Sequence, residues 1–353
     1  MGRSARWCPS LRTYLYNMKL ARHILSVTVF VFVALSFVFL AERGMSATDK
    51  AQPAMERLHP VSKQEHGIGG PLMIALPQEV RAPNVSSEVY FCEERMPLEF
   101  TDIHERFDQE LLRNTYWHSS TLLNMKRLGK YFDAIAAVFD RYAIPPDVRY
   151  LAIAESNLSN VVSPAGAAGY WQFMKATGSS YGLEITSEVD ERYHFEKATE
   201  AACLFLQDLY QQITSDFPDT KTPWTLAAAA YNMGYPALKR AMTQQRVDNY
   251  YDLHLNRETA RYVFRITAFK VILEHPEEFG YSLSQNDLYT MENTYTITVD
   301  STVRDLTDFA LSQGTTLKEL KRLNPWLRSK TLTASEAKPY TLTLATEPQV
   351  HQD

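Results

Sequence analysis

The sequence predicts an α+β protein that is mostly α, with a helical domain followed by a small βααβ module. Apolar residues recur at helical spacing between residues 104 and 274, whereas the alternation typical of strands is found only after residue 290. The 353 residues are 45% hydrophobic and 22% charged. This length suits two or three domains, and this composition excludes wholesale disorder, collagen and coiled coil.

Residues 1–46 predict a signal peptide or an N-terminal membrane anchor. Residues 24–41 are apolar except for two serines and a threonine, and only basic charges precede them. This stretch is short for a membrane span and slightly long for a signal-peptide core. Gly44 and Ser46 are small, as cleavage after Ser46 requires. We expect an exported protein of the periplasm or cell envelope, with membrane contact through this segment if it is uncleaved.

The charge and the cysteines exclude other classes of protein. After residue 45 the chain has 30 Lys and Arg against 40 Asp and Glu, which does not suit a nucleic-acid-binding protein. Three cysteines without C-x-x-C spacing are too few for a disulfide scaffold and predict no metal site. Cys203 lies in an apolar stretch and is expected to be a buried thiol. The sequence indicates no cofactor and no oligomeric state.

Residues 47–103 are expected to form a linker or pre-domain, and residues 104–282 the helical domain. The linker carries Pro, Gly, Gln and Ser with little periodicity. No strand is expected before residue 290. The helical signals lie at residues 107–112, 122–128, 131–142, 148–155, 196–213, 224–231 and 258–274.

Residues 293–345 are expected to form the βααβ module. Alternating apolar residues predict strands at 295–299 and 340–344. Helical spacing predicts one helix at 303–310 that ends near Gly314, and another at 317–323 that Pro325 stops. Polar residues 284–287 suit a hinge, so the module is expected to be a separable accessory.

Glu155 is the candidate catalytic residue. A helix over residues 148–155 places Glu155 at its end, on the same apolar face as Val148 and Leu151. Burial without a basic partner favours the neutral form of a carboxyl and raises its pKa. A glutamic acid that is protonated near neutral pH can protonate a leaving glycosidic oxygen. The alternative is a solvated glutamate at a helix end, where this residue type is common.

Other segments supply groups that suit sugar binding. Residues 164–169 carry a proline and two glycines, which let a backbone approach a ligand, and Gln172 follows directly. Tyr231 and Asn232 follow an alanine-rich stretch, and Tyr262 offers a second aromatic hydroxyl. Each residue alone fits ordinary packing or surface polarity. Together with Glu155 they predict a carbohydrate-binding cleft.

Four ordered blocks resemble the signature of the lytic murein transglycosylase family, whose SLT catalytic domain has a lysozyme-like fold. The blocks are Glu155-Ser156, Gly169-Tyr170-Trp171-Gln172, Ala230-Tyr231-Asn232, and Glu258-Thr259 with Tyr262. They cover roughly residues 106–281, and the chain is most similar to the membrane-bound lytic murein transglycosylase D branch. Tyr170-Trp171 stands where this family more often has Leu-Met, and the segment from Glu155 to Gln172 is about one residue shorter.

The module at residues 293–345 resembles a degenerate LysM domain, which implies glycan binding. The turn at residues 300–303 lacks the glycine that is usual in that family, whereas Gly314 and Asn324-Pro325 fit it. Shallow loops around Thr302 and residues 324–326 would then contact the glycan. Trp326 has two expected roles, stacking on a sugar ring or filling the core of the module.

The resemblance implies cleavage of the β-1,4 bond between N-acetylmuramic acid and N-acetylglucosamine in peptidoglycan strands. Glu155 would be acid and then base, the muramoyl C6 hydroxyl would close on C1, and a 1,6-anhydro end would form without metal or cofactor. Gln172, Tyr231, Asn232 and Tyr262 would line the cleft, with Ser163 and Met174 as further contacts.

Two alternatives stay open at this point. The first is a lysozyme-type hydrolase in which a second carboxylate, Asp190 or Glu191, positions a water. The second is a non-catalytic cell-wall binding protein, although a pure binder does not need a desolvated acid. The sequence does not distinguish exo from endo cleavage.

Overall fold

A computed structural model describes residues 80–84 and 88–347, which all belong to one compact unit of the chain. Within these ranges, no helix combines the length and the apolar character that crossing a membrane requires. The expected signal peptide or anchor at residues 1–46 lies outside the described residues.

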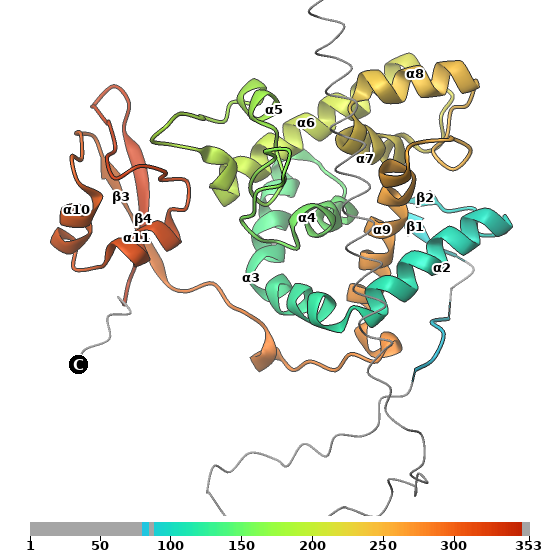
Figure 1. The fold of residues 1–353 in the computed structure, drawn as a ribbon, viewed down its shortest axis with the longest axis horizontal. Coiled ribbons are helices and arrows are strands. Elements are labelled where there is room, and N and C mark those ends of the chain that lie inside the picture. Colours follow the sequence, from blue (N-terminus) through green and yellow to red (C-terminus); the bar gives the residue numbers. More distant parts are fainter. Residues whose placement is uncertain (1–79, 85–87, 348–353) are drawn as a thin grey trace, which may run out of the picture. The chain divides into compact units, whose positions relative to one another are not determined.

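The helical domain is built from eight α-helices in its described part, joined by turns and by longer loops on both sides of the short helix at residues 175–180 (Figure 1). Every helical signal in the sequence is confirmed, with bounds that differ by a few residues. The predicted segments 122–128 and 131–142 form one continuous helix, and the helices at residues 175–180 and 235–245 were not predicted. The helices are α2 (Thr101–Tyr116), α3 (His118–Tyr142), α4 (Arg149–Ser156), α5 (Lys175–Ser180), α6 (Phe195–Asp216), α7 (Pro223–Met233), α8 (Tyr235–Gln245) and α9 (Arg257–Glu274).

Helix α4 lies in the middle of this domain and packs against α3 and α9 (Figure 1). Its residues 150–154 are all buried, so the helix is covered on every side except near its C-terminal end. The alanine-rich α7 packs against both α6 and α9. Its buried residues 227–230 are all alanine, and these small side chains let the neighbouring helices approach closely.

A short β-hairpin precedes the helices, so the expectation of no strand before residue 290 is wrong. Strands β1 (Tyr90–Phe91) and β2 (Glu94–Arg95) pair antiparallel. Phe91 and Met96 are buried in the core of the helical domain. That core therefore starts before the expected boundary at residue 104, and periodicity does not reveal it because two-residue strands are too short to alternate visibly.

The C-terminal module has the expected βααβ order. Strands β3 (Thr294–Val299) and β4 (Tyr340–Ala345) pair antiparallel along their full length. Helices α10 (Leu306–Ser312) and α11 (Leu317–Leu323) lie between them in the chain. Asp305 and Thr316 cap the two helices by accepting hydrogen bonds from backbone N–H groups of the first turn.

The C-terminal module packs against the helical domain through a shared set of buried residues. The expected hinge at residues 284–287 had suggested a module without such packing. Ala168, Val189 and Tyr193 of the helical domain are buried in the core of the module. Trp326 is 3% exposed and stacks between His194 and Tyr340, so the second of its two expected roles, filling the core, holds.

The expected glycan-contacting loops of the module are only partly available. Asn324 is fully buried, and its side chain binds the backbone oxygens of Leu320 and Thr343. Together with Trp326 it forms part of the packing of the module. Thr302 is exposed, so this expected glycan contact remains accessible.

Candidate active site

Glu155 occupies the last turn of α4, just before a strained turn of the backbone. Asn157 and Leu158 both have positive φ angles, 51° and 53°, which non-glycine residues rarely adopt. Asn124 and Arg127 of α3 hold this turn by hydrogen bonds to the side-chain and backbone oxygens of Asn157. Because the surroundings fix the strained turn, the end of α4 presents Glu155 in a defined position.

The Glu155 carboxyl is neutral over a wider pH range than an ordinary glutamate. Burial raises its pKa from 4.5 to about 7. The Tyr262 hydroxyl donates a hydrogen bond to Glu155 Oε1 and lowers the pKa, as does the positive charge of Arg265. The negative charge of Glu258 raises it. The side chain is still partly exposed, so a substrate can reach this acid.

Tyr262, which is buried, and Tyr231, which is partly buried, place two phenols beside the Glu155 carboxyl. The charge of Glu155 raises the pKa of both hydroxyls, after the larger effect of burial. Tyr231 donates its hydroxyl proton to the backbone oxygen of Trp171 at 2.7 Å. Tyr262 thus contacts the acid itself, whereas Tyr231 fixes the loop that lies next to it.

Asn232 is held by residues at the start of α9. Its side-chain oxygen accepts a hydrogen bond from the Thr259 hydroxyl at 2.7 Å, and its side-chain nitrogen donates to Glu258 at 3.3 Å. Asn256 caps α9 by accepting from the backbone N–H groups of Glu258 and Thr259. Asn232 is therefore oriented by groups that also place a negative charge near Glu155.

Two of the remaining predicted site residues, Gln172 and Ser163, lie on one loop, residues 163–173, which we call the site loop. Gln172 has a φ of 50° and donates its side-chain N–H groups to the backbone oxygens of Val161 and Gly169. Ser163 Oγ accepts from the backbone N–H of Ala167 within the same loop. These two side chains hold the site loop together.

The structure links Glu155 through hydrogen bonds or close charges to Tyr262, Tyr231 and Glu258. Among the described hydrogen bonds, none connects the Glu155 side chain to Ser163, Gln172 or Asn232, and Met174, which directly follows the site loop, is 46% exposed. The roles of these four side chains in binding substrate stay predictions.

Gly169 packs closely against the backbone of Arg192, whereas the sequence suggested a close approach to a ligand. A Cβ atom added at this position would lie 1.8 Å from the backbone oxygen of Arg192, and the φ of 83° also favours glycine. The next two residues, Tyr170 and Trp171, are buried as well. The indole N–H of Trp171 donates to the Thr199 hydroxyl at 3.0 Å, so this departure from the family pattern fills the core.

The two carboxylates considered for a hydrolase are engaged in ion pairs. Asp190 is buried and forms two hydrogen bonds with the Arg192 guanidinium, at 2.7 and 3.0 Å. Glu191 pairs with Lys197 and accepts a hydrogen bond from the backbone N–H of Glu184. Both carboxylates therefore have structural partners, which does not favour either as the residue that positions a water.

Two functional candidates were missed in the sequence. Arg265 lies three residues after Tyr262 on α9, and this spacing on a helix could have indicated a second group facing Glu155. Arg192 donates to the backbone oxygens of Gly166 and Phe173 in the site loop, at 2.9 and 3.1 Å. No sequence pattern signals that contact, because it depends on a turn between distant segments.

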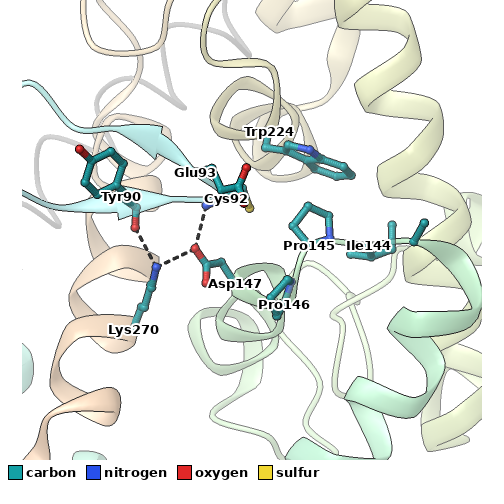
Figure 2. A pocket seen from close by; sticks show the side chains of 10 residues that line it. Tyr90, Cys92, Glu93, Ile144, Pro145, Pro146, Asp147, Trp224 and Lys270 are labelled. Carbon is teal, nitrogen blue, oxygen red and sulfur yellow. Dashed lines mark hydrogen bonds and ion pairs between the residues drawn. The ribbon is translucent and has the colours of Figure 1, made fainter.

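A separate cavity of about 730 Å³ opens near the β-hairpin, and none of the predicted site residues lines it (Figure 2). Trp224 and Pro145 form part of its wall. Asp147 accepts from the backbone N–H of Cys92 and pairs with Lys270 at 2.7 Å. These contacts attach the hairpin to the helical domain, and Cys92 is buried there. Cys92 and Cys203 are both free thiols, as expected for Cys203.

Comparisons with known proteins agree with the resemblance drawn from the sequence. Residues 133–253 match the family described as the transglycosylase SLT domain. Residues 295–348 match the soluble lytic transglycosylase C-terminal LysM-like domain.

Two curated relatives are named membrane-bound lytic murein transglycosylase D, from Escherichia coli strain K12 and from Escherichia coli O6:H1. The chain is 30% identical to each over 233 residues, which cover 64% of this chain and 48% of the relative. The chain thus spans about half the length of the curated relatives it matches. Two successive segments of the chain are therefore similar to the transglycosylase SLT domain and to the soluble lytic transglycosylase C-terminal LysM-like domain.

Proposed function

We propose that this protein is a peptidoglycan lytic transglycosylase that uses Glu155 as both acid and base. The observation that carries the proposal is a partly exposed glutamate with a pKa near 7, hydrogen-bonded to Tyr262, within a domain that matches the SLT family. Such a carboxyl is protonated in about half of the molecules at pH 7, so it can donate a proton and accept one in the same reaction.

In the first step, Glu155 donates its proton to the oxygen that joins N-acetylmuramic acid to N-acetylglucosamine. The bond from C1 of the muramoyl residue to that oxygen breaks, and N-acetylglucosamine leaves with a free hydroxyl. Positive charge develops at C1, where the muramoyl acetamide can stabilise it. The Glu155 carboxylate that remains is stabilised by the Tyr262 hydroxyl and by the charge of Arg265.

In the second step, Glu155 accepts the proton of the muramoyl C6 hydroxyl, and the oxygen of that hydroxyl forms a bond to C1. A 1,6-anhydro ring forms, and Glu155 is protonated again. No water is consumed, and no second carboxylate is needed. Gln172 and Asn232 are the proposed contacts for substrate amides and hydroxyls, and Tyr231 keeps the site loop in place.

Hydrolysis of the same bond is the second candidate function. Glu258 is exposed and its charge acts on Glu155, so it is the carboxylate to test if water attacks C1. Asp190 is paired with Arg192 and Glu191 with Lys197, so Glu258 is the better candidate for this role.

The proposed partner is the glycan strand of peptidoglycan, and the proposed location is the periplasm or cell envelope. The LysM-like module would add a second glycan contact, which raises the effective concentration of substrate near the site. The segment at residues 1–46 would export the protein and, if uncleaved, tether it to the membrane.

Digestion of purified sacculi in water labelled with a heavy oxygen isotope tests this proposal. The expected products end in anhydromuramoyl residues, contain no label and are lighter than reducing ends by one water. Products that carry the label at a reducing end would show hydrolysis, and intact sacculi would contradict catalysis of either kind.

A further inference from the structure

The C-terminal module contacts the helical domain at residues 184–194, which we call the docking segment. Backbone hydrogen bonds cross this contact in both directions: Asp190 N–H donates to Trp326, and Arg328 N–H donates to Glu188, at 2.9 and 2.8 Å. Val189 pairs with Leu327 in an isolated β-bridge, and both side chains are buried. The module therefore adds a short strand-like contact to the docking segment.

Side chains reinforce this contact along its whole length. Glu188 accepts from the Thr331 hydroxyl and the Thr333 N–H, at 2.6 and 2.8 Å. Glu184 pairs with Lys338 at 2.7 Å. The Arg328 guanidinium lies 4.3 Å from the centre of the Tyr193 ring. Apolar packing, hydrogen bonds and charge all act at one place, which indicates a built interface.

The docking segment is bound on its other side to the site loop. Asp190, whose N–H is bound by the module, holds the Arg192 guanidinium with both carboxylate oxygens. The same guanidinium donates to the backbone oxygens of Gly166 and Phe173. The backbone oxygen of Arg192 is so close to Gly169 that a side chain would not fit there.

The site loop itself is part of the core that the module completes. Ala168 is fully buried among the residues of the module, and its backbone exchanges two hydrogen bonds with Phe173. The oxygen of Tyr170, two residues later, accepts from the hydroxyl of Ser156, the neighbour of Glu155. An unbroken series of contacts thus runs from the module, through Asp190 and Arg192, to the residue beside the acid.

We propose that the C-terminal module braces the site loop through the docking segment, and that Arg192 is a positioning residue for the Glu155 site. The proposal rests on the proposed function for its effect on catalysis, and gives the module a role beyond glycan binding. Val189, Ala168 and Tyr193 belong to the packing of the module and not to the main helical core. Loss of the module contact therefore loosens the loop while the helices remain folded.

The test uses the full-length protein with Val189→Asp, which buries an unpaired charge against Leu327 and releases the module. Glu188→Ala is a milder second variant that removes two polar contacts of a partly exposed side chain and leaves the apolar packing intact. Leu311→Ser is the matched control, because Leu311 is 63% exposed on α10 and lies outside the contact. Amide hydrogen exchange and turnover of short soluble peptidoglycan chains are measured for each.

In Val189→Asp we expect the Asp190 and Arg328 amides to lose protection, and the Ala168, Gly169 and Phe173 amides to exchange at least about tenfold faster. Amides in α6 and α9 should exchange at the wild-type rate. Turnover of short chains should fall by about tenfold or more, since small displacements of a site cost that much. Glu188→Ala should shift the same amides less, and Leu311→Ser should match wild type.

Wild-type exchange in the site loop after release of the module would overturn the proposal, and so would continued protection of Asp190 and Arg328 in Val189→Asp. A loss of activity on sacculi alone, with normal turnover of short chains, would show that the module only binds glycan and would also overturn it. If the wild-type protein cleaves no glycan, the proposed function fails while the exchange data still decide this proposal.

Discussion

Two glutamates, the partly exposed Glu155 and the buried Glu94, have similarly raised pKa values in very different surroundings. Burial raises the pKa of each from 4.5 to about 7. Glu155 stands at the C-terminal end of α4, where the helix dipole disfavours a negative charge, and the Tyr262 hydroxyl is its hydrogen-bond donor. Glu94 accepts the backbone N–H groups of Trp224 and Thr225, at the start of α7.

The comparison teaches that a raised pKa alone does not identify a catalytic acid. Both oxygens of Glu94 are used to satisfy N–H groups that the start of a helix leaves without partners, so this carboxyl is structural. Glu155 is a partly exposed residue, and its carboxyl has a hydroxyl, a cation and an anion close by. The partners of the group, and its access to substrate, decide between the two roles.

The largest expected difference between the two glutamates is in activity. Glu155→Gln should lower turnover of peptidoglycan by about 10⁴-fold or more, because an amide can neither donate nor accept the proton in either step. Glu94→Gln should stay within a few-fold of wild type in folded protein. Comparable losses in both variants, at equal folded fractions by circular dichroism, would remove the distinction.

Substitutions of the two glutamates should change the free energy of unfolding in opposite directions. The folded pKa of Glu155 is above its unfolded value of 4.5, so the protein loses stability as pH rises from about 4.5 to 7 and does not regain it above. Glu155→Gln should therefore raise the free energy of unfolding at pH 8 by up to about 3 kcal/mol, and by nothing at pH 4. Glu94→Ala should lower it by about 2–4 kcal/mol, because two buried N–H groups lose their acceptor. Urea unfolding at both pH values checks this.

Tyr262→Phe should move the pH profile of the reaction. The Tyr262 hydroxyl lowers the pKa of Glu155 by stabilising the carboxylate, so its loss should shift the fall in kcat to higher pH by about one unit. Tyr231→Phe is the control, because its hydroxyl binds the Trp171 oxygen and not the carboxyl. A profile that shifts equally in both variants, or only in the control, would argue against this assignment.

The smallest expected effects come from the two charges near Glu155. Glu258→Gln removes an anion that raises the pKa of Glu155, so the fall in kcat should move to lower pH, by about 0.3 units. Arg265→Gln removes a cation that lowers the pKa, and the fall should move to higher pH by a similar amount. The kcat profiles at low salt should show shifts of opposite sign, and shifts of the same sign would refute this electrostatic account.

The sequence predicted most helices of the core, though not α5 or α8, and it predicted that Glu155 ends a helix, because helical spacing depends on residues a few positions apart. It predicted the βααβ module for the same reason. The β-hairpin at Tyr90–Arg95 was missed, since its stability comes from Phe91 packing against distant helices. The pairing of Asp190 with Arg192, and the use of Gly169 to admit the Arg192 backbone, depend on contacts between separate turns. Such contacts have no period along the chain, so no local pattern predicts them.

The carbon NMR titration of the Glu155 carboxyl tests the central claim most directly. The signal can be assigned by its absence in Glu155→Gln, and Glu94 provides an internal comparison in the same spectra. We predict a midpoint near pH 7 for Glu155 that coincides with the fall in kcat as pH rises, and a profile that Glu94→Gln does not move. A midpoint near the ordinary value of 4.5, or a fall in kcat that follows Glu94 and not Glu155, would contradict the account.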